Sequence, residues 1–267
     1  MCASEITGRS TLLDRPRFGG EAFRVWLRFT ALSFGGPARP IAVMHLHNVA
    51  IRATILAGAL VFCMMEASIA MADQASFADD TVGASPKGWT ATMTGKGNPK
   101  WTVEEDPTAR SKARVVKQSG TATYPLLLKD GTSLKNGFVE IWFRTISGSE
   151  DRAAGIVWRA RDANNYYVVR ANALEDNVVA YKTVNGARSA LDIVGRKGGY
   201  GVTVPVPSGQ WHALRVEFAG SHFKVLFNGK AAFEVEDGTF ADAGQIGLWT
   251  KADSVTAFDD ISYGALP

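Results

Sequence analysis

From Trp101 to the C-terminus, apolar and polar residues alternate in short runs that are separated by turn residues. The runs are rich in β-branched and aromatic residues, and no amphipathic helical period of ordinary length competes with them. Asn228-Gly229 stands between two runs and predicts a tight hairpin, because both residues tolerate the positive φ of such a turn. We therefore expect an all-β fold, a two-sheet sandwich or jelly roll. The expected strands are 139–146, 155–161, 165–173, 177–184, 211–218, 222–227, 231–236, 245–251 and 255–263.

The alternation assigns the side chains of each expected strand to two faces, since successive residues leave opposite sides of a strand. It sends Trp158, Tyr167 and Val169 to the core and leaves arginine, asparagine and aromatic groups on the other face. Planar donors can bind sugar hydroxyls while an aromatic ring stacks on the C–H face of a sugar. The pattern thus predicts a shallow saccharide site on one sheet. The candidate ligand-binding residues are Trp142, Arg159, Tyr166, Arg170, Asn172 and Trp249.

A solvated sheet face explains the same pattern without a ligand. Glu140 would then pair across strands with Arg159 or Arg170. The alternation alone does not choose between these two interpretations.

The first 72 residues differ from the rest of the chain. Arg52 precedes an uncharged apolar run, 53–65, whose 13 residues fall short of the ~20 that span a bilayer. Small residues follow at alternate positions, so cleavage after Ala70 or Ala72 fits a secretory signal. We expect a signal peptide at 44–72, a domain at 73–267, a secreted or periplasmic location, and no stable membrane insertion after cleavage.

Charge and cysteine content agree with this division. Residues 1–72 contain 7 Lys and Arg against 4 Asp and Glu, whereas residues 73–267 contain 22 of each. A formally neutral domain without a basic stripe argues against nucleic acid as a partner. Both cysteines, Cys2 and Cys63, precede residue 73, so we expect no disulfide in the domain. We also expect no cofactor and no metal.

Residues 23–45, FRVWLRFTALSFGGPARPIAVMH, resemble the opening segment of the chromate ion transporter family. The resemblance stops there, and no later segment is long and apolar enough to span a bilayer, so we predict no transport activity. We interpret 1–43 as a fusion remnant or as the result of a start codon assigned too far upstream, with Met44 as the conventional start.

A second resemblance covers about 76–263. It rests on GIVWR from Gly155, DANNYY from Asp162, FNGK from Phe227, AGQIGLWT from Ala243 and FDD from Phe258. Together these elements resemble the concanavalin A-like lectin/glucanase superfamily, and within it the 3-keto-disaccharide hydrolase and laminin-G-like group. The resemblance implies a jelly-roll sandwich of two antiparallel sheets and a saccharide ligand on a concave sheet face. Because the superfamily includes hydrolases and non-catalytic modules, it leaves the activity open.

Three functions follow, of which we favour an exported carbohydrate-binding protein. The first alternative is a glycoside hydrolase acting on 3-keto-disaccharides or related glycosides, with Glu140, Glu175 and Asp176 as acid–base candidates. The sequence lacks the E-x-D-x-E run of laminarinase-type relatives, which weakens this alternative. The second alternative is a sandwich that binds another protein and no sugar.

Overall fold

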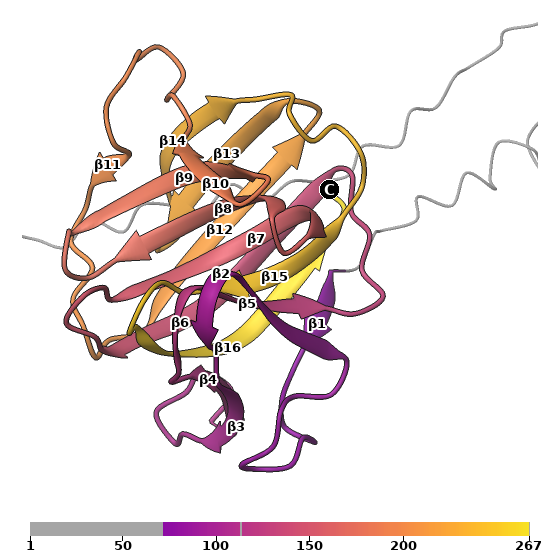
Figure 1. The fold of residues 1–267 in the computed structure, drawn as a ribbon, viewed down its shortest axis with the longest axis vertical. Helices are drawn as coiled ribbons and strands as arrows, with labels where there is room; N and C mark the ends of the chain where they lie inside the picture. Colours follow the sequence, from indigo (N-terminus) through magenta and orange to yellow (C-terminus); the bar gives the residue numbers. More distant parts are fainter. Residues whose placement is uncertain (1–71, 113, 267) are drawn as a thin grey trace, which may run out of the picture. The chain divides into compact units, whose positions relative to one another are not determined.

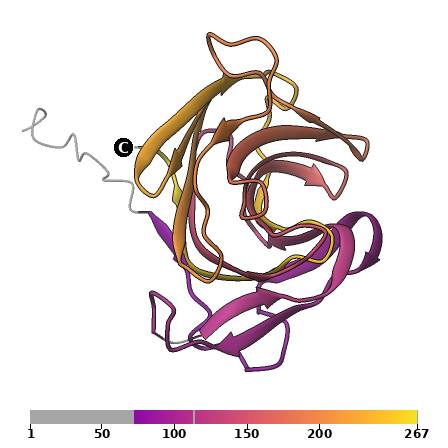
Figure 2. The same ribbon diagram turned by 90° about the vertical axis from the view of Figure 1, so that its left-hand side faces the viewer.

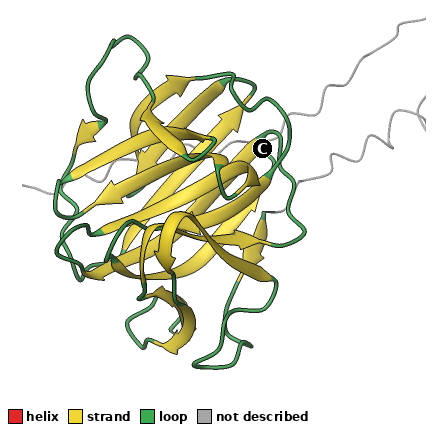
Figure 3. Ribbon diagram, viewed as in Figure 1, coloured by secondary structure: helices red, strands yellow, loops and turns green. Residues whose placement is uncertain are grey.

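The computed structural model describes residues 72–112 and 114–266, which form two antiparallel sheets that face each other (Figure 1). Nearly all of the expected signal peptide and the whole of 1–43 lie outside the described residues. Within the described ranges every regular element is a strand (Figure 3), so they contain no helix able to cross a membrane. The all-β prediction with two antiparallel sheets is confirmed.

Sheet A has the strand order β14-β13-β12-β6-β16-β4-β3, with β1 paired to β16. Its strands are β1 (Asp73–Ala75), β3 (Trp101–Glu105), β4 (Arg114–Gln118), β6 (Gly137–Ser147), β12 (His212–Ala219), β13 (His222–Phe227), β14 (Lys230–Glu236) and β16 (Val255–Gly264).

Sheet B has the order β10-β9-β8-β7-β15-β5-β2, with β11 paired to β9. Its strands are β2 (Trp89–Asn98), β5 (Thr121–Lys129), β7 (Ala153–Asp162), β8 (Asn165–Asn172), β9 (Asn177–Val184), β10 (Ala187–Ala190), β11 (Val202–Thr203) and β15 (Gln245–Trp249).

The hairpin predicted at Asn228-Gly229 joins β13 to β14. Both residues have positive φ, 48° for Asn228 and 75° for Gly229, as a tight two-residue hairpin turn requires. The strand pairing on either side is antiparallel, with one irregularity between Val225 and Leu226. The tolerance of Asn228 and Gly229 for positive φ therefore explains why β13 and β14 are joined by a tight hairpin.

The main core fills the space between the two sheets. Trp158 lies at its centre, stacked on Tyr167 with ring centroids 5.3 Å apart and meeting the ring of Phe223 edge-on at 5.4 Å. Sheet A contributes the inward residues of β6, namely Val139, Ile141 and Phe143. Buried aromatic surface of this kind is the dominant stabilising term in a domain that has no disulfide.

A second, smaller apolar cluster lies on the other side of sheet B, away from sheet A. Strong curvature of the sheets (Figure 2) encloses this side, so its side chains are buried although no second sheet formed by the described residues covers them. The cluster consists of Leu126, Leu128, Ala153, Val157, Ala160, Tyr166, Val168, Val179, Tyr181 and Trp249.

Candidate functional site

The far side of sheet B is rolled into a trough. Arg188 of β10 stacks 4.7 Å from the ring centroid of Tyr124 on β5. These strands are five steps apart in the sheet, which at ~4.8 Å per step would be roughly 24 Å in a flat sheet. Only a strongly rolled sheet brings them into contact. We call this surface the trough and define it by Tyr124, Tyr166, Arg170, Tyr181, Arg188 and Trp249.

One end of the trough is closed by contacts between distant strands. The hydroxyl of Thr94 on β2 lies 2.8 Å from the phenol oxygen of Tyr166 on β8. A Cβ on Gly186, in the turn between β9 and β10, would lie 3.7 Å from the methyl group of Thr94. Tyr166 is 0% exposed, and its burial raises the pKa of the phenol against the lowering effect of Thr94. Tyr166 is therefore a neutral wall residue.

The other end carries a polar network built on Arg170. Its Nη2 donates to Oε2 of Glu175 at 2.8 Å and to the phenol oxygen of Tyr200 at 2.9 Å. Nη1 donates to the side-chain oxygen of Asn177, whose amide in turn donates to Glu175 at 2.9 Å. The network holds the Glu175 carboxylate in one position while 37% of that side chain stays exposed.

Asn172 extends this network to a second ion pair. Its Nδ2 donates to Oε1 of Glu175 at 3.1 Å and to Oδ1 of Asp151 at 2.9 Å. Asp151 also accepts a hydrogen bond from the ammonium group of Lys251. Because one nitrogen bonds both carboxylates, the two bonded oxygens lie no more than about 6 Å apart.

The charges at this end stabilise one another. Burial alone would raise the pKa of Glu175, but hydrogen bonds from Asn177 and Arg170 outweigh it and lower the pKa. Burial alone would lower the pKa of Arg170, but Tyr181, Tyr200 and Glu175 raise it. Glu175 is therefore an ionised acceptor at neutral pH, and Arg170 is a fixed cation.

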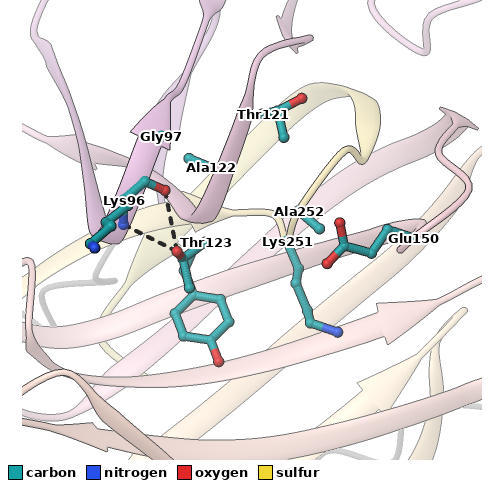
Figure 4. A pocket seen from close by; sticks show the side chains of 9 residues that line it. Lys96, Gly97, Thr121, Ala122, Thr123, Glu150, Lys251 and Ala252 are labelled. Carbon is teal, nitrogen blue, oxygen red and sulfur yellow. Dashed lines mark hydrogen bonds between the residues drawn. The ribbon is translucent and has the colours of Figure 1, made fainter.

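A pocket of about 350 Å³ opens beside Lys251 (Figure 4). The Tyr124 ring, which stacks on Trp249 with centroids 5.5 Å apart, also lines it. Lys96 and Glu150 contribute one further charge of each sign. Since Lys251 also pairs with Asp151, the pocket adjoins the polar network. Its remaining lining residues are Gly97, Thr121, Ala122, Thr123 and Ala252.

Several predicted site residues meet at the trough. Tyr166, Arg170 and Asn172 lie on one side of β8, opposite Tyr167 and Val169, as the alternation predicts. Trp249 also reaches the trough, but it is 0% exposed and lies beneath Tyr124. The residues that the sequence analysis missed here are Tyr124, Asp151, Tyr181, Arg188, Tyr200 and Lys251.

Arg159 does not lie in the trough, and its predicted face is wrong. It has a φ of 48° and sits where the pairing of β7 with both neighbours shifts register, a β-bulge. The bulge places Arg159 on the same side as Trp158. It is 1% exposed and donates at 2.8 Å to the main-chain oxygens of Lys135, Gly220 and Phe240.

Glu140 and Trp142 lie on sheet A, on the face turned away from sheet B. Trp142 stacks under Arg110, 4.5 Å from the ring centroid, and Glu140 pairs with Arg215 at 3.5 Å. The expected pairing of Glu140 with Arg159 or Arg170 is therefore wrong, because β6 belongs to sheet A and β7 and β8 to sheet B.

Asp176 is also directed away from the network. Its carboxylate accepts a hydrogen bond from the main-chain nitrogen of Val206 at 2.9 Å, and its φ is 47°. Asp176 thus anchors the loop that returns to β12. Glu175, its neighbour in sequence, is the acid that joins the trough.

The described residues contain no cluster of three or more His, Cys, Asp or Glu side chains suited to a metal ion. What the trough offers is an ionised acceptor, fixed cations and partly exposed phenol rings. These are the groups that bind a polyhydroxylated ligand.

Comparison with known protein families gives a match over most of the described residues. Residues 74–263 match the family described as the 3-keto-alpha-glucoside-1,2-lyase-like domain. No curated protein matches the chain significantly.

Among solved structures, the carbohydrate binding module CBM66 from Bacillus subtilis is similar over 67% of this chain and 96% of its own, with 21% identity and a TM-score of 0.52. The cellulose induced protein Cip1 is similar over 73% and 97%, with 15% identity and a TM-score of 0.53. At these identities the likeness shows the fold alone, and the predicted concanavalin A-like jelly roll is confirmed.

Proposed function

Because the chain belongs to the family of 3-keto-alpha-glucoside-1,2-lyase-like domains, we propose that it binds a saccharide at the open end of the trough. The observation that carries this proposal is the Glu175 carboxylate, ionised, held by Arg170 and Asn172, and still partly open to solvent. A fixed carboxylate accepts hydrogen bonds from vicinal sugar hydroxyls without losing side-chain entropy on binding.

Two rings supply the apolar part of such a site. Tyr200 is 49% exposed, and its phenol oxygen already bonds Arg170 and Tyr181. Tyr124 lines the adjoining pocket. Sugar C–H faces pack well on partly exposed aromatic rings, whose hydroxyls remain available for polar contacts.

Calorimetry of the full chain with a panel of neutral and modified oligosaccharides tests this proposal. We expect at least one sugar to bind, and Tyr200→Ala to weaken that binding about tenfold. Val194→Ala is the matched control, because Val194 is 51% exposed in the same loop and its main-chain nitrogen bonds Glu234 of sheet A. Failure of every sugar to bind, or equal affinity in Tyr200→Ala, would contradict the proposal.

A second function, cleavage of 3-keto-glycosides, is favoured by one specific observation. The bonded oxygens of Asp151 and Glu175 lie within about 6 Å of each other, and retaining glycosidases hold their carboxyl groups ~5–5.5 Å apart. A 3-keto sugar also permits elimination: a carboxylate takes the C2 proton α to the ketone, the C1–O bond breaks, and the departing oxygen takes a proton.

Binding remains the better-supported function because both carboxylates are committed to cations. Asp151 is 2% exposed and pairs with Lys251, and the lowered pKa of Glu175 makes it a poor proton donor. Product release from 3-keto-glucosides decides the question. Cleavage would be established if the wild-type chain released product and if Asp151→Asn and Glu175→Gln each abolished this turnover. Absence of product from the wild-type chain would exclude cleavage for the substrates assayed.

We also propose that the domain acts after export, as the 44–72 pattern predicts. Mass spectrometry of the N-terminal peptide of the native protein is the test. An N-terminus at 71 or 73 is expected, and an exported protein that retains a peptide from 1–43 would contradict the proposed start and cleavage.

A further inference from the structure

Three arginines of sheet B differ in what their N–H groups contact. Arg159 donates to main-chain carbonyls, and Arg170 donates to side-chain oxygens of the network. The guanidinium of Arg188 has no hydrogen bond and no ion pair among the described residues, and its Nη1 is a buried donor without a partner. A guanidinium carries five N–H donors and no acceptor. Arg170 leaves only its Nε without a partner, whereas none of the donors of the Arg188 guanidinium has one among the described residues.

The position of Arg188 is nevertheless well defined. Its guanidinium carbon lies 4.2 Å from the ring centroid of Tyr181, 4.7 Å from that of Tyr124 and 5.4 Å from that of Trp249. Cation–π stacking uses the faces of the guanidinium and leaves its N–H edges free. The rings therefore hold the cation in place without satisfying its donors.

Arg188 stands between the pocket and the polar network. It shares Tyr124 with the pocket and Tyr181 with Arg170. A ligand that enters the pocket and reaches toward Glu175 would pass this side chain.

The nearby acids do not compensate the positive charge of Arg188. Glu175 pairs with Arg170, and Asp151 pairs with Lys251. In the pocket, Lys96 and the exposed Glu150 add one charge of each sign. Arg188 thus leaves one positive charge unbalanced in the trough, in a place where aromatic rings reduce its contact with water.

We propose that Arg188 recognises a carboxylate, so that the saccharide bound in the trough carries a uronic acid unit. A planar carboxylate can accept two parallel N–H bonds from a guanidinium, and its single negative charge balances the single unpaired cation. The proposal rests on the saccharide-binding function above and adds the ligand class.

Calorimetry on the full chain tests this proposal with matched pairs of disaccharides. The two members of a pair have the same linkage, and one ends in glucose where the other ends in glucuronate. We expect the wild-type chain to bind the glucuronate member at least tenfold more tightly, and added salt to reduce this preference. This measurement requires no variant and therefore does not depend on the folding of one.

Variants then assign the preference to one residue. We expect Arg188→Met to abolish the difference in affinity between the two members of a pair, and Arg188→Lys to retain only part of that difference. Arg161→Met is the matched control for loss of one positive charge, because Arg161 pairs with exposed Asp242 outside the trough. Melting curves verify that each variant is folded.

The outcomes separate the two proposals. Equal affinity of the wild-type chain for both members of each pair would overturn the role of Arg188 and leave saccharide binding intact. A preference for the glucuronate member that persists in Arg188→Met would likewise overturn the role of Arg188 and leave saccharide binding intact. Failure of both members to bind would overturn saccharide binding, and the uronate proposal with it.

Discussion

The two sides of sheet B use buried arginine in opposite ways. Toward sheet A, Arg159 donates to carbonyls of three connecting segments, at Lys135, Gly220 and Phe240. On the trough side, Arg170 donates to the carboxylate, amide and phenol oxygens of side chains, among them Glu175. Both side chains are 1% exposed, so burial alone does not distinguish their roles.

What distinguishes them is the kind of acceptor. Main-chain carbonyls cannot move without moving the loops, so Arg159 fixes the end of the sandwich. Side-chain acceptors can exchange partners when a ligand arrives, so the surface around Arg170 can take part in binding. This contrast predicts that the inner side governs stability and the trough governs affinity.

Arg159→Met is the substitution for which this contrast predicts the largest effect. It leaves three main-chain carbonyl groups without their donor, one of them fully buried and two partly buried, and we expect the free energy of unfolding to fall by about 3 kcal/mol. Urea titration followed by tryptophan fluorescence measures the change. Arg161→Met, whose ion pair with Asp242 is exposed, should cost less than ~0.5 kcal/mol. A loss below ~1 kcal/mol in Arg159→Met would refute the anchoring role.

The carboxylate of Asp237 provides a pH-dependent test of how the side of sheet B that faces sheet A contributes to stability. It accepts hydrogen bonds from Tyr167 at 2.7 Å and from Lys182 at 2.7 Å. Burial would raise its pKa, but Lys182, Thr239 and Tyr167 outweigh this and lower the pKa from 3.8 to about 2. Since the folded pKa lies below the unfolded one, the stabilisation is complete above pH ~4 and disappears as the pH falls toward 2.

We expect Asp237→Asn to destabilise the domain by about 2 kcal/mol at pH 7, with the difference from wild type narrowing below pH ~4. Denaturant titrations at several pH values measure both quantities. Saccharide affinity at pH 7 should not change, because Asp237 contacts the core and not the trough. A difference that stays constant down to pH 2 would show that the Asp237 carboxylate charge is not the cause.

Glu175→Gln tests the trough side. The substitution keeps the shape of the side chain and removes the charge, so we expect saccharide affinity to fall about tenfold, or ~1.4 kcal/mol. The lowered pKa keeps Glu175 ionised, so wild-type affinity should be constant between about pH 5 and 8. Asp176→Asn is the control, because that neighbouring carboxylate bonds Val206 instead. Equal losses in both variants would indicate a general effect on the loop.

Alternation predicted part of this arrangement correctly. β8 is regular, so the separation of Tyr166, Arg170 and Asn172 from Tyr167 and Val169 follows from the period of two. It failed at Arg159, because a bulge inserts one residue into β7 and places two consecutive side chains on one face. No signal in the local pattern marks that residue as the bulge.

The remaining trough residues depend on how distant strands pair. Tyr124 and Arg188 are 64 positions apart and meet only because sheet B rolls. Sheet membership is equally invisible in a local pattern: β6 and β7 are consecutive, yet they belong to opposite sheets. Two polar faces that look alike in sequence, around Trp142 and around Arg170, are therefore separate surfaces.

Trp142→Ala tests that separation and should have the smallest effect on binding. Trp142 stacks with Arg110 on sheet A, so we expect loss of that contact to reduce stability by about 1 kcal/mol and to leave saccharide affinity within twofold. Calorimetry with the sugar that binds best, beside Tyr200→Ala as a positive control, measures this. If Trp142→Ala weakened binding as much as Tyr200→Ala, the ligand would contact the outer face of sheet A, and the contrast between the two sides of sheet B would not describe where binding occurs.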